Sequence, residues 1–204
     1  GVVGIGLGLM HTDISVRVLG IDAQREMVQA AEDNAYNLGL EHMYRGRLGD
    51  VREHRHHPDI EAEKFDRVVC NPPYRKMNQG RHPENRGKRR ACFQESAGLD
   101  DFVLAASYAV VNKGRVHLVQ VADNASTLLS RLQARRLEPK EMRLVHPNRN
   151  APARLVLVRA VKNARPGMRV LAPLFADNAL DMEVFCPLLQ GATCPPPAQH
   201  GFAF

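Results

Sequence analysis

The stretch that decides the fold is Asp66-Arg67-Val68-Val69-Cys70-Asn71-Pro72-Pro73-Tyr74. A short apolar run ends in an asparagine and two prolines, and a proline pair permits neither a helix nor continued pairing in a sheet. The chain must therefore leave the sheet here. We expect the Asn71 side chain, the Pro72 carbonyl and the Tyr74 ring to lie at the carboxyl end of a strand. In open α/β sheets, ligands bind at that edge.

The tetrapeptide Asn71-Pro72-Pro73-Tyr74 resembles the signature of the amino-methyltransferases, which use S-adenosylmethionine to methylate an amino or amide nitrogen. The resemblance implies that these four residues are catalytic. An exocyclic amine is a poor nucleophile because its lone pair is delocalised; the Asn71 amide oxygen and the Pro72 carbonyl would each accept one of its N–H groups. Tyr74 would stack on the base. The sulfonium methyl is already activated, so positioning and electrostatics carry most of the catalysis. The plainer alternative is a turn in which the prolines act only as breakers.

Three further features match a cofactor site. The start, Gly1-Val2-Val3-Gly4-Ile5-Gly6, is typical of a nucleotide-binding loop entering a helix, although such glycines also serve close packing. Asp22 ends an apolar run, where an acid typically binds ribose hydroxyls; its alternative role is a helix N-cap. Asp50 matches the acid that approaches the adenine in the family, with a solvated turn as the alternative. The cofactor implied by the resemblance is S-adenosyl-L-methionine, bound by Gly1, Asp22, Ala23, Asp50, Val51 and Asn71.

A long basic stretch follows the tetrapeptide over residues 75–90. It is polar and punctuated by glycine and proline, which predicts a loop over the active edge. Charge runs are usually solvated surface, but this one directly follows the proposed reacting site, and we expect it to contact the phosphates of a tRNA or other structured RNA. The candidate RNA-binding residues are Arg75, Lys76, Arg81, Arg86, Lys88, Arg89 and Arg90.

Composition agrees with this reading. The 204 residues suffice for one domain, and 28 Lys and Arg against 22 Asp and Glu give a net charge of +6, which favours a polyanionic partner. No apolar run approaches membrane-spanning length. The four cysteines have no metal spacing and indicate reduced thiols in a cytoplasm. His54, His56 and His57 fit no zinc pattern, so we expect surface charge there and no metal. The sequence does not indicate an oligomeric state.

The remaining pattern predicts an α/β fold. Helices are expected over 99–111, over 125–137 and after Asp22, the last with Met27, Ala30, Ala31, Asn34, Ala35 and Leu38 forming one buried stripe. The strands expected over 141–147 and 154–160 are joined by only six residues, too few for a helical crossover, and should be antiparallel neighbours.

The resemblance covers about residues 1–174 and implies a Rossmann-like class I methyltransferase sheet over that range. It would be mostly parallel, with an antiparallel C-terminal strand pair. A partly irregular tail would follow over 175–204. In the family a strand and earlier glycines precede the position of Gly1, so we expect the first strand to be missing.

The resemblance is closest to the bacterial tRNA adenine-N6 methyltransferases that modify the adenine beside the anticodon of a valine tRNA. The sequence departs from that family at Arg90-Ala91-Cys92-Phe93-Gln94-Glu95, where an Ala-Arg-His-Glu-like stretch is common. The main rival is a glutamine-N5 methyltransferase of release factors, which carries the same tetrapeptide but usually a separate N-terminal helical domain. Methylation of guanine amines in ribosomal RNA is disfavoured by Tyr74, because Phe is more usual there. The third alternative is a catalytically dead RNA-binding remnant that lacks the first strand.

Overall fold

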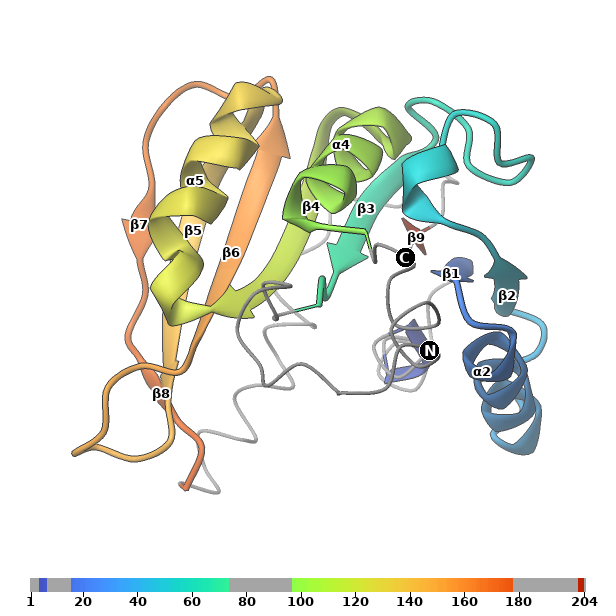
Figure 1. Ribbon diagram of the computed structural model, residues 1–204, viewed down its shortest axis with the longest axis horizontal. Coiled ribbons are helices and arrows are strands. Elements are labelled where there is room, and N and C mark those ends of the chain that lie inside the picture. Colours follow the sequence, from blue (N-terminus) through green and yellow to red (C-terminus); the bar gives the residue numbers. More distant parts are fainter. Residues whose placement is uncertain (1–3, 7–15, 74–96, 178–201, 204) are drawn as a thin grey trace, which may run out of the picture.

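The computed structural model describes residues 4–6, 16–73, 97–177 and 202–203, which form one sheet with helices packed against it (Figure 1). The helices are α2 (Arg25–Asn37), α4 (Leu99–Ala109) and α5 (Ala125–Ala134), with two 3-10 turns, η1 (Val51–Glu53) and η2 (Ala122–Asn124). The strands are β1 (Val18–Asp22), β2 (Tyr44–Leu48), β3 (Phe65–Cys70), β4 (Val110–Val121), β5 (Leu137–His146), β6 (Leu155–Lys162), β7 (Arg169–Val170), β8 (Leu174–Phe175) and β9 (Phe202–Ala203).

The strands are ordered β2-β1-β9-β3-β4-β6-β5-β7, and β8 pairs with the end of β5. Every neighbouring pair is parallel except those of β6, which runs antiparallel to both β4 and β5. In Figure 1 the arrow of β6 accordingly points the opposite way from that of β3. The predicted α/β fold is confirmed, and so is the antiparallel pairing across the short connection 148–153.

Two clusters of buried side chains hold helices on opposite faces of the sheet. Helices α4 and α5 cover one face, where Val68, Val116 and Leu132 are completely buried. Helix α2 packs its Ala31 and Ala35 with Val18 on the other face. Because side chains alternate along a strand, Val18 faces α2 while its neighbour Leu19 packs against the α4 and α5 cluster. None of the helices described is long and apolar enough to cross a membrane.

The buried stripe predicted for α2 is only partly right. Ala31 and Ala35 are buried, but Ala30 and Asn34 are exposed, as are Met27 at 48% and Leu38 at 49%. The reason is that, within the described part of the chain, α2 packs mainly on β1 and β2, so that a narrow face is covered. That face runs through Val28 and Glu32, whose side chains lie 3.1 and 3.0 Å from the position that a Cβ at Gly46 would take. Glycine in β2 thus lets the helix approach the strand closely.

The position between β1 and β3 is taken by residues from the end of the chain. Phe202 and Ala203 form β9, which pairs in parallel with Val18 and Leu19 on one side and with Arg67 and Val68 on the other. Among the described residues, β1 is the first strand in the sequence. Three residues of the predicted tail therefore form part of the sheet, namely Phe175 of β8 and both residues of β9, and residues 178–201 lie outside the described residues.

Candidate active site

The strand β3 delivers Asn71 to the carboxyl edge of the sheet. Val68 and Cys70 are buried in the main core, and the Asn-Pro-Pro sequence ends the strand immediately after them. Pro72 is also among the fully buried side chains, whereas Asn71 and Pro73 are exposed. Pro72 therefore anchors the turn in the core, and its ring holds the backbone so that the Asn71 side chain lies outside.

Asp22 ends β1 at the same edge. Its Oδ1 accepts a hydrogen bond from the Gln24 amide at 2.9 Å, and its main-chain oxygen accepts one from the Gly49 amide at 2.9 Å. Among the described residues, nothing donates to Oδ2. The N-cap of α2 is Gln24, not Asp22, so the alternative role considered for Asp22 is not the one it takes.

The sheet register places Asp22 and Asn71 at the same height. Val18 and Arg67 both pair with Phe202, and four residues further along each strand come Asp22 and Asn71. One strand, β9, separates them, which corresponds to a lateral distance of about 10 Å. Because side chains alternate along a strand and the two residues are level, their side chains belong to the same face of the sheet. A single extended ligand lying along this edge can therefore meet both.

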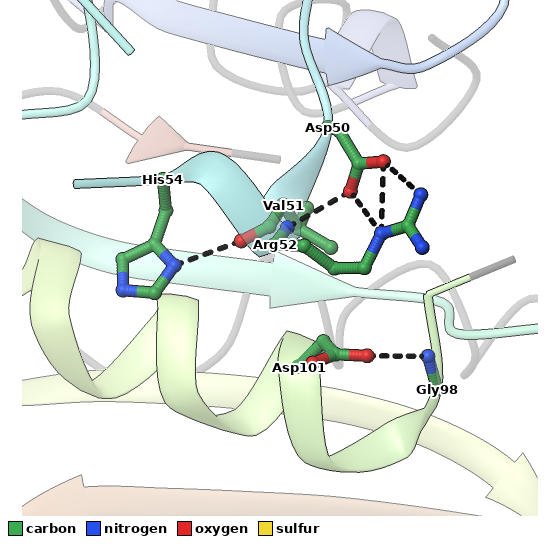
Figure 2. A network of polar contacts seen from close by, with 6 residues as sticks. All are labelled: Asp50, Val51, Arg52, His54, Gly98 and Asp101. Atoms are coloured by element: carbon green, nitrogen blue, oxygen red, sulfur yellow. Dashed lines mark hydrogen bonds and ion pairs between the residues drawn. The ribbon is translucent and has the colours of Figure 1, made fainter. Parts of the chain in front are cut away.

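Asp50 lies just beyond β2, in a set of polar contacts shown in Figure 2. Its carboxylate accepts from the Arg52 amide at 2.9 Å and from the Arg52 guanidinium Nε at 2.9 and 3.0 Å. The hydrogen bonds from Arg52 hold the pKa of Asp50 below its usual value. Asp50 thus caps the turn η1, and an adenine amine at this carboxylate would share it with Arg52. Val51, the next residue, is buried and supplies backbone rather than side chain to the edge.

The histidines near this turn serve backbone bonds. His54 is buried and its Nδ1 bonds to the Val51 carbonyl at 2.8 Å, while its ring meets Tyr108 edge-on (Figure 2 shows the bond). His57 contacts the Leu48 carbonyl through Nε2 and accepts from the Asp59 amide through Nδ1. No cluster of three metal-ligating side chains occurs within the described ranges.

Two buried side chains of the central strands, Cys70 of β3 and His117 of β4, have strongly shifted pKa values. Burial raises the pKa of the Cys70 thiol to about 12, so it remains protonated. Burial, with the charges of Arg67, Arg159 and Arg115, lowers the pKa of His117 to about 4, so its imidazole is neutral. Neither side chain is therefore poised as a nucleophile or as a general base.

Several predicted site residues lie outside the described residues, namely Gly1, Tyr74 and the seven basic residues of the stretch 75–90. Of the others, Ala23 is exposed in the bend after Asp22. Residues 4–6 are helical, and a Cβ at Gly4 would lie 2.7 Å from Val18 Cγ1, so that this glycine serves close packing. The structure thus places Asp22, Asp50 and Asn71 along one edge.

Two features of this edge were not predicted. Tyr44 of β2 packs under Gly20, where a Cβ would lie 2.2 Å from the Tyr44 hydroxyl. Desolvation by burial, with the charges of Glu32 and Asp22, raises the pKa of Tyr44. The second feature is the connection between β5 and β6, which carries Arg149 and Arg154. The sequence shows that this connection is basic, but it does not show at which edge of the sheet the connection lies.

Comparisons with known proteins agree on the class. A family model described as an RMKL-like methyltransferase domain matches residues 9–95. A tRNA1(Val) (adenine(37)-N6)-methyltransferase of Porphyromonas gingivalis is 26% identical over 188 residues, which cover 90% of this chain and 68% of the relative. An enzyme of the same name from Actinobacillus succinogenes is 24% identical over 131 residues, covering 61% of this chain and 53% of the relative.

Solved structures share the fold. A predicted O-methyltransferase from Agrobacterium tumefaciens has a TM-score of 0.64 at 17% identity, with 99% of this chain and 98% of that chain covered. Geranyl diphosphate C-methyltransferase from Streptomyces coelicolor, in complex with S-adenosyl-L-homocysteine, has a TM-score of 0.54 at 13% identity, covering 78% and 68%. At such identities the likeness concerns the fold alone.

Taken together, the family model over residues 9–95, the curated relatives and the shared fold support a class I S-adenosylmethionine-dependent methyltransferase. The residues at the edge fit that cofactor. Asp22 Oδ2, to which none of the described residues donates, has the acceptor chemistry that a ribose hydroxyl requires, and Asn71 lies at the same height about 10 Å away, within the reach of one extended molecule. When bound, S-adenosylmethionine supplies an activated methyl group on its sulfonium.

Proposed function

We propose that this chain transfers the methyl group to the N6 amine of an adenine in tRNA. The observation that carries the proposal is the exposed Asn71 held at the carboxyl end of β3 by a buried Pro72, level with Asp22. The names of the curated relatives, which are tRNA adenine-N6 enzymes, support the same acceptor. The net charge of +6 and the basic stretch 75–90 favour a polyanionic substrate.

In this proposal the protein works by aiming the acceptor nitrogen. The Asn71 amide oxygen accepts one N–H of the adenine amine and the Pro72 carbonyl accepts the other. The two bonds draw the nitrogen lone pair out of the ring system and toward the methyl group. Because the Pro72 ring is buried, the carbonyl is fixed before the substrate arrives, which lowers the cost of ordering the site. Tyr74 follows directly in sequence and would stack on the base.

The test is transfer of labelled methyl groups from S-adenosylmethionine to unmodified tRNA. Asn71→Ala is expected to lower kcat by about 10²–10³-fold, the cost typical of losing one oriented hydrogen-bonding group at a reacting centre. Binding of S-adenosylhomocysteine and the melting temperature should stay near wild-type values. Asn124→Ala provides the matched control, because Asn124 follows the neighbouring strand β4 and its side chain makes no capping bond. Normal transfer by Asn71→Ala would contradict the mechanism.

Methyl-transfer and binding assays also distinguish the proposed function from two alternative functions. A glutamine-N5 methyltransferase would label a peptide-chain release factor and leave tRNA unlabelled. A catalytically dead RNA-binding remnant would retain tRNA on a filter but would neither bind S-adenosylhomocysteine nor label any acceptor. Either pattern would overturn the proposal.

A further inference from the structure

The connection between β5 and β6 lies at the same edge of the sheet as Asn71. Strand β5 is parallel to β4 in the sheet because β6 is antiparallel to both, so β5 ends where β3 and β4 end (Figure 1). Cys70 pairs with Leu118, which makes Asn71 level with Val119. Strands β4 and β5 both extend beyond the level of Asn71 in the direction of the carboxyl edge. The connection, residues 147–154, therefore projects further from the sheet than Asn71 does, at the same edge.

This connection, residues 147–154, is held firmly by hydrogen bonds. The Arg154 amide donates to the Val145 carbonyl at 2.8 Å, and the Arg154 carbonyl accepts from the Ala122 amide at 3.0 Å. The His146 ring bonds through Nδ1 to the Ala151 carbonyl at 2.8 Å. Asn148 folds the tip, with its Oδ1 accepting from the Asn150 amide at 2.9 Å. The backbone from which Arg149 and Arg154 extend is therefore held at a defined place relative to the edge.

Arg149 and Arg154 are exposed on this connection. The guanidinium of Arg149 lies over the Phe175 ring, 5.0 Å from its centroid, and Phe175 also meets the His146 ring at 5.6 Å. The aromatic ring orients the guanidinium and leaves its charge available, because a cation–π contact uses none of its hydrogen-bond donors. Within the described ranges, neither arginine forms an ion pair with a carboxylate.

The lateral distance between Asn71, at the end of β3, and the connection that follows β5 suits a nucleic-acid strand better than a small substrate. From β3 to β5 the sheet advances by three strand spacings, about 14 Å. A free nucleoside held at Asn71 does not reach that far, whereas a polynucleotide does within a few nucleotides. Acidic side chains near the connection, Asp123 and Asp177, make no ion pair with these arginines in the described part of the chain. The negative charges of these two carboxylates disfavour phosphate on their own sides of the connection.

We propose that Arg149 and Arg154 bind phosphates of the RNA strand a few nucleotides from the target adenine, and that Phe175 positions Arg149 for this contact. The inference rests on the proposed function, since it needs an RNA substrate at Asn71. It adds a second anchor, on the opposite side of Asn71 from Asp22. Such contacts would set the orientation of the strand without reading its sequence.

The test compares the variant Arg149→Ala/Arg154→Ala with Arg165→Ala/Arg136→Ala, which removes two exposed arginines at the opposite edge. Initial rates on tRNA and on an adenine-containing trinucleotide are measured over a range of salt concentrations. We expect KM for tRNA to rise about tenfold in the first variant. The slope of log kcat/KM against log salt should become shallower by about 1.4, since each phosphate contact on a single strand contributes about 0.7. Rates on the trinucleotide should not change.

Two single variants separate charge from folding. Arg149→Lys retains the charge and should retain most of the salt slope, whereas Phe175→Leu should lose about as much as Arg149→Ala. If the double variant has the KM and slope of the wild-type chain, or if the opposite-edge control loses as much, the inference is wrong. A wild-type chain that methylates no RNA would remove the proposed function and this inference together. Wild-type transfer with an unchanged slope would remove only the inference.

Discussion

At the scale of single residues, the candidate site contains two groups that the fold orders before any ligand binds, the Asp22 carboxylate and the backbone beside Asn71. The Gln24 amide holds one oxygen of Asp22, and the other is left as an acceptor among the described residues. The buried Pro72 fixes the backbone beside Asn71. Because both groups are ordered in advance, a ligand does not lose affinity to their ordering. A charged acceptor such as Asp22 forms stronger hydrogen bonds with hydroxyl groups than a neutral acceptor does.

Replacing Asp22 with Asn should weaken the binding of S-adenosylhomocysteine by about 10–100-fold, because a hydrogen bond to a charged group contributes about 1.5–3 kcal/mol. The Asn oxygen can still accept from the Gln24 amide, so the fold should be unaffected. Calorimetric titration measures the affinity, and thermal melting checks the fold. Asp33→Asn on the exposed side of α2 is the control with the same change of charge. Wild-type affinity in Asp22→Asn would exclude the ribose role.

At the scale of elements, one acidic residue of β5 forms ion pairs that link this strand to its neighbours β6 and β7. Glu141 of β5 accepts from Arg159 of β6 at 2.8 Å and from Arg169 of β7. Its side chain is only 18% exposed, so these ion pairs are less screened than surface ones. The hydrogen bond from Arg159, the largest influence, lowers the pKa of Glu141 to about 2, with Arg169 adding to it.

The stability that Glu141 contributes should therefore depend on pH. Its folded-state pKa is depressed from 4.5 to about 2, so its contribution is present above pH 4.5 and is lost as the pH falls toward 2. The melting temperature of Glu141→Gln should lie below that of the wild-type chain at pH 7, and the gap should close between pH 4.5 and 2. Glu138→Gln on the same strand is the control, because Glu138 has no ion pair within the described ranges. A gap that stays constant with pH would contradict this assignment.

The packing of Tyr44 under Gly20 gives a prediction for β1 and β2. A Cβ at residue 20 would lie 2.2 Å from the Tyr44 hydroxyl and 2.9 Å from its Cζ. Gly20→Ala should cost about 1–3 kcal/mol of unfolding free energy, as overpacking does, and lower the melting temperature by several degrees. In a Tyr44→Phe background the hydroxyl is absent, and the same substitution should cost less than half as much. An equal cost in both backgrounds would show that the Tyr44 hydroxyl is not what the new methyl group meets.

The elements could be predicted from the sequence where one local signal decides them. The prolines after Cys70 end β3, and the short connection 148–153 makes β5 and β6 antiparallel. The buried stripe of α2 was partly wrong because hydrophobic spacing alone does not show how wide a surface the helix will cover. The edge at which 148–153 lies was left open, since it depends on the direction of β5 relative to β3. That direction is a property of the whole sheet.

At the scale of the whole molecule, strand order decides which residues meet. Asp22 and Asn71 are 49 positions apart in the numbering, yet pairing through β9 brings them level at one edge. The sequence predicts each residue at the end of its strand but not their shared height, which is set by Phe202 and Ala203 from the other end of the chain. Asp50 and the connection 147–154 extend the same edge on either side. Net charge and edge geometry together favour a long anionic substrate.

The most direct measurement is to identify the methylated nucleoside. Unmodified tRNA would be incubated with the chain and labelled S-adenosylmethionine, digested to nucleosides and analysed by mass spectrometry. The account predicts that the label appears in N6-methyladenosine with the wild-type chain, and that this product falls by about 10²–10³-fold with Asn71→Ala. Label in any other nucleoside, or in a protein glutamine and not in tRNA, would contradict the central claim that Asn71 aims an adenine amine.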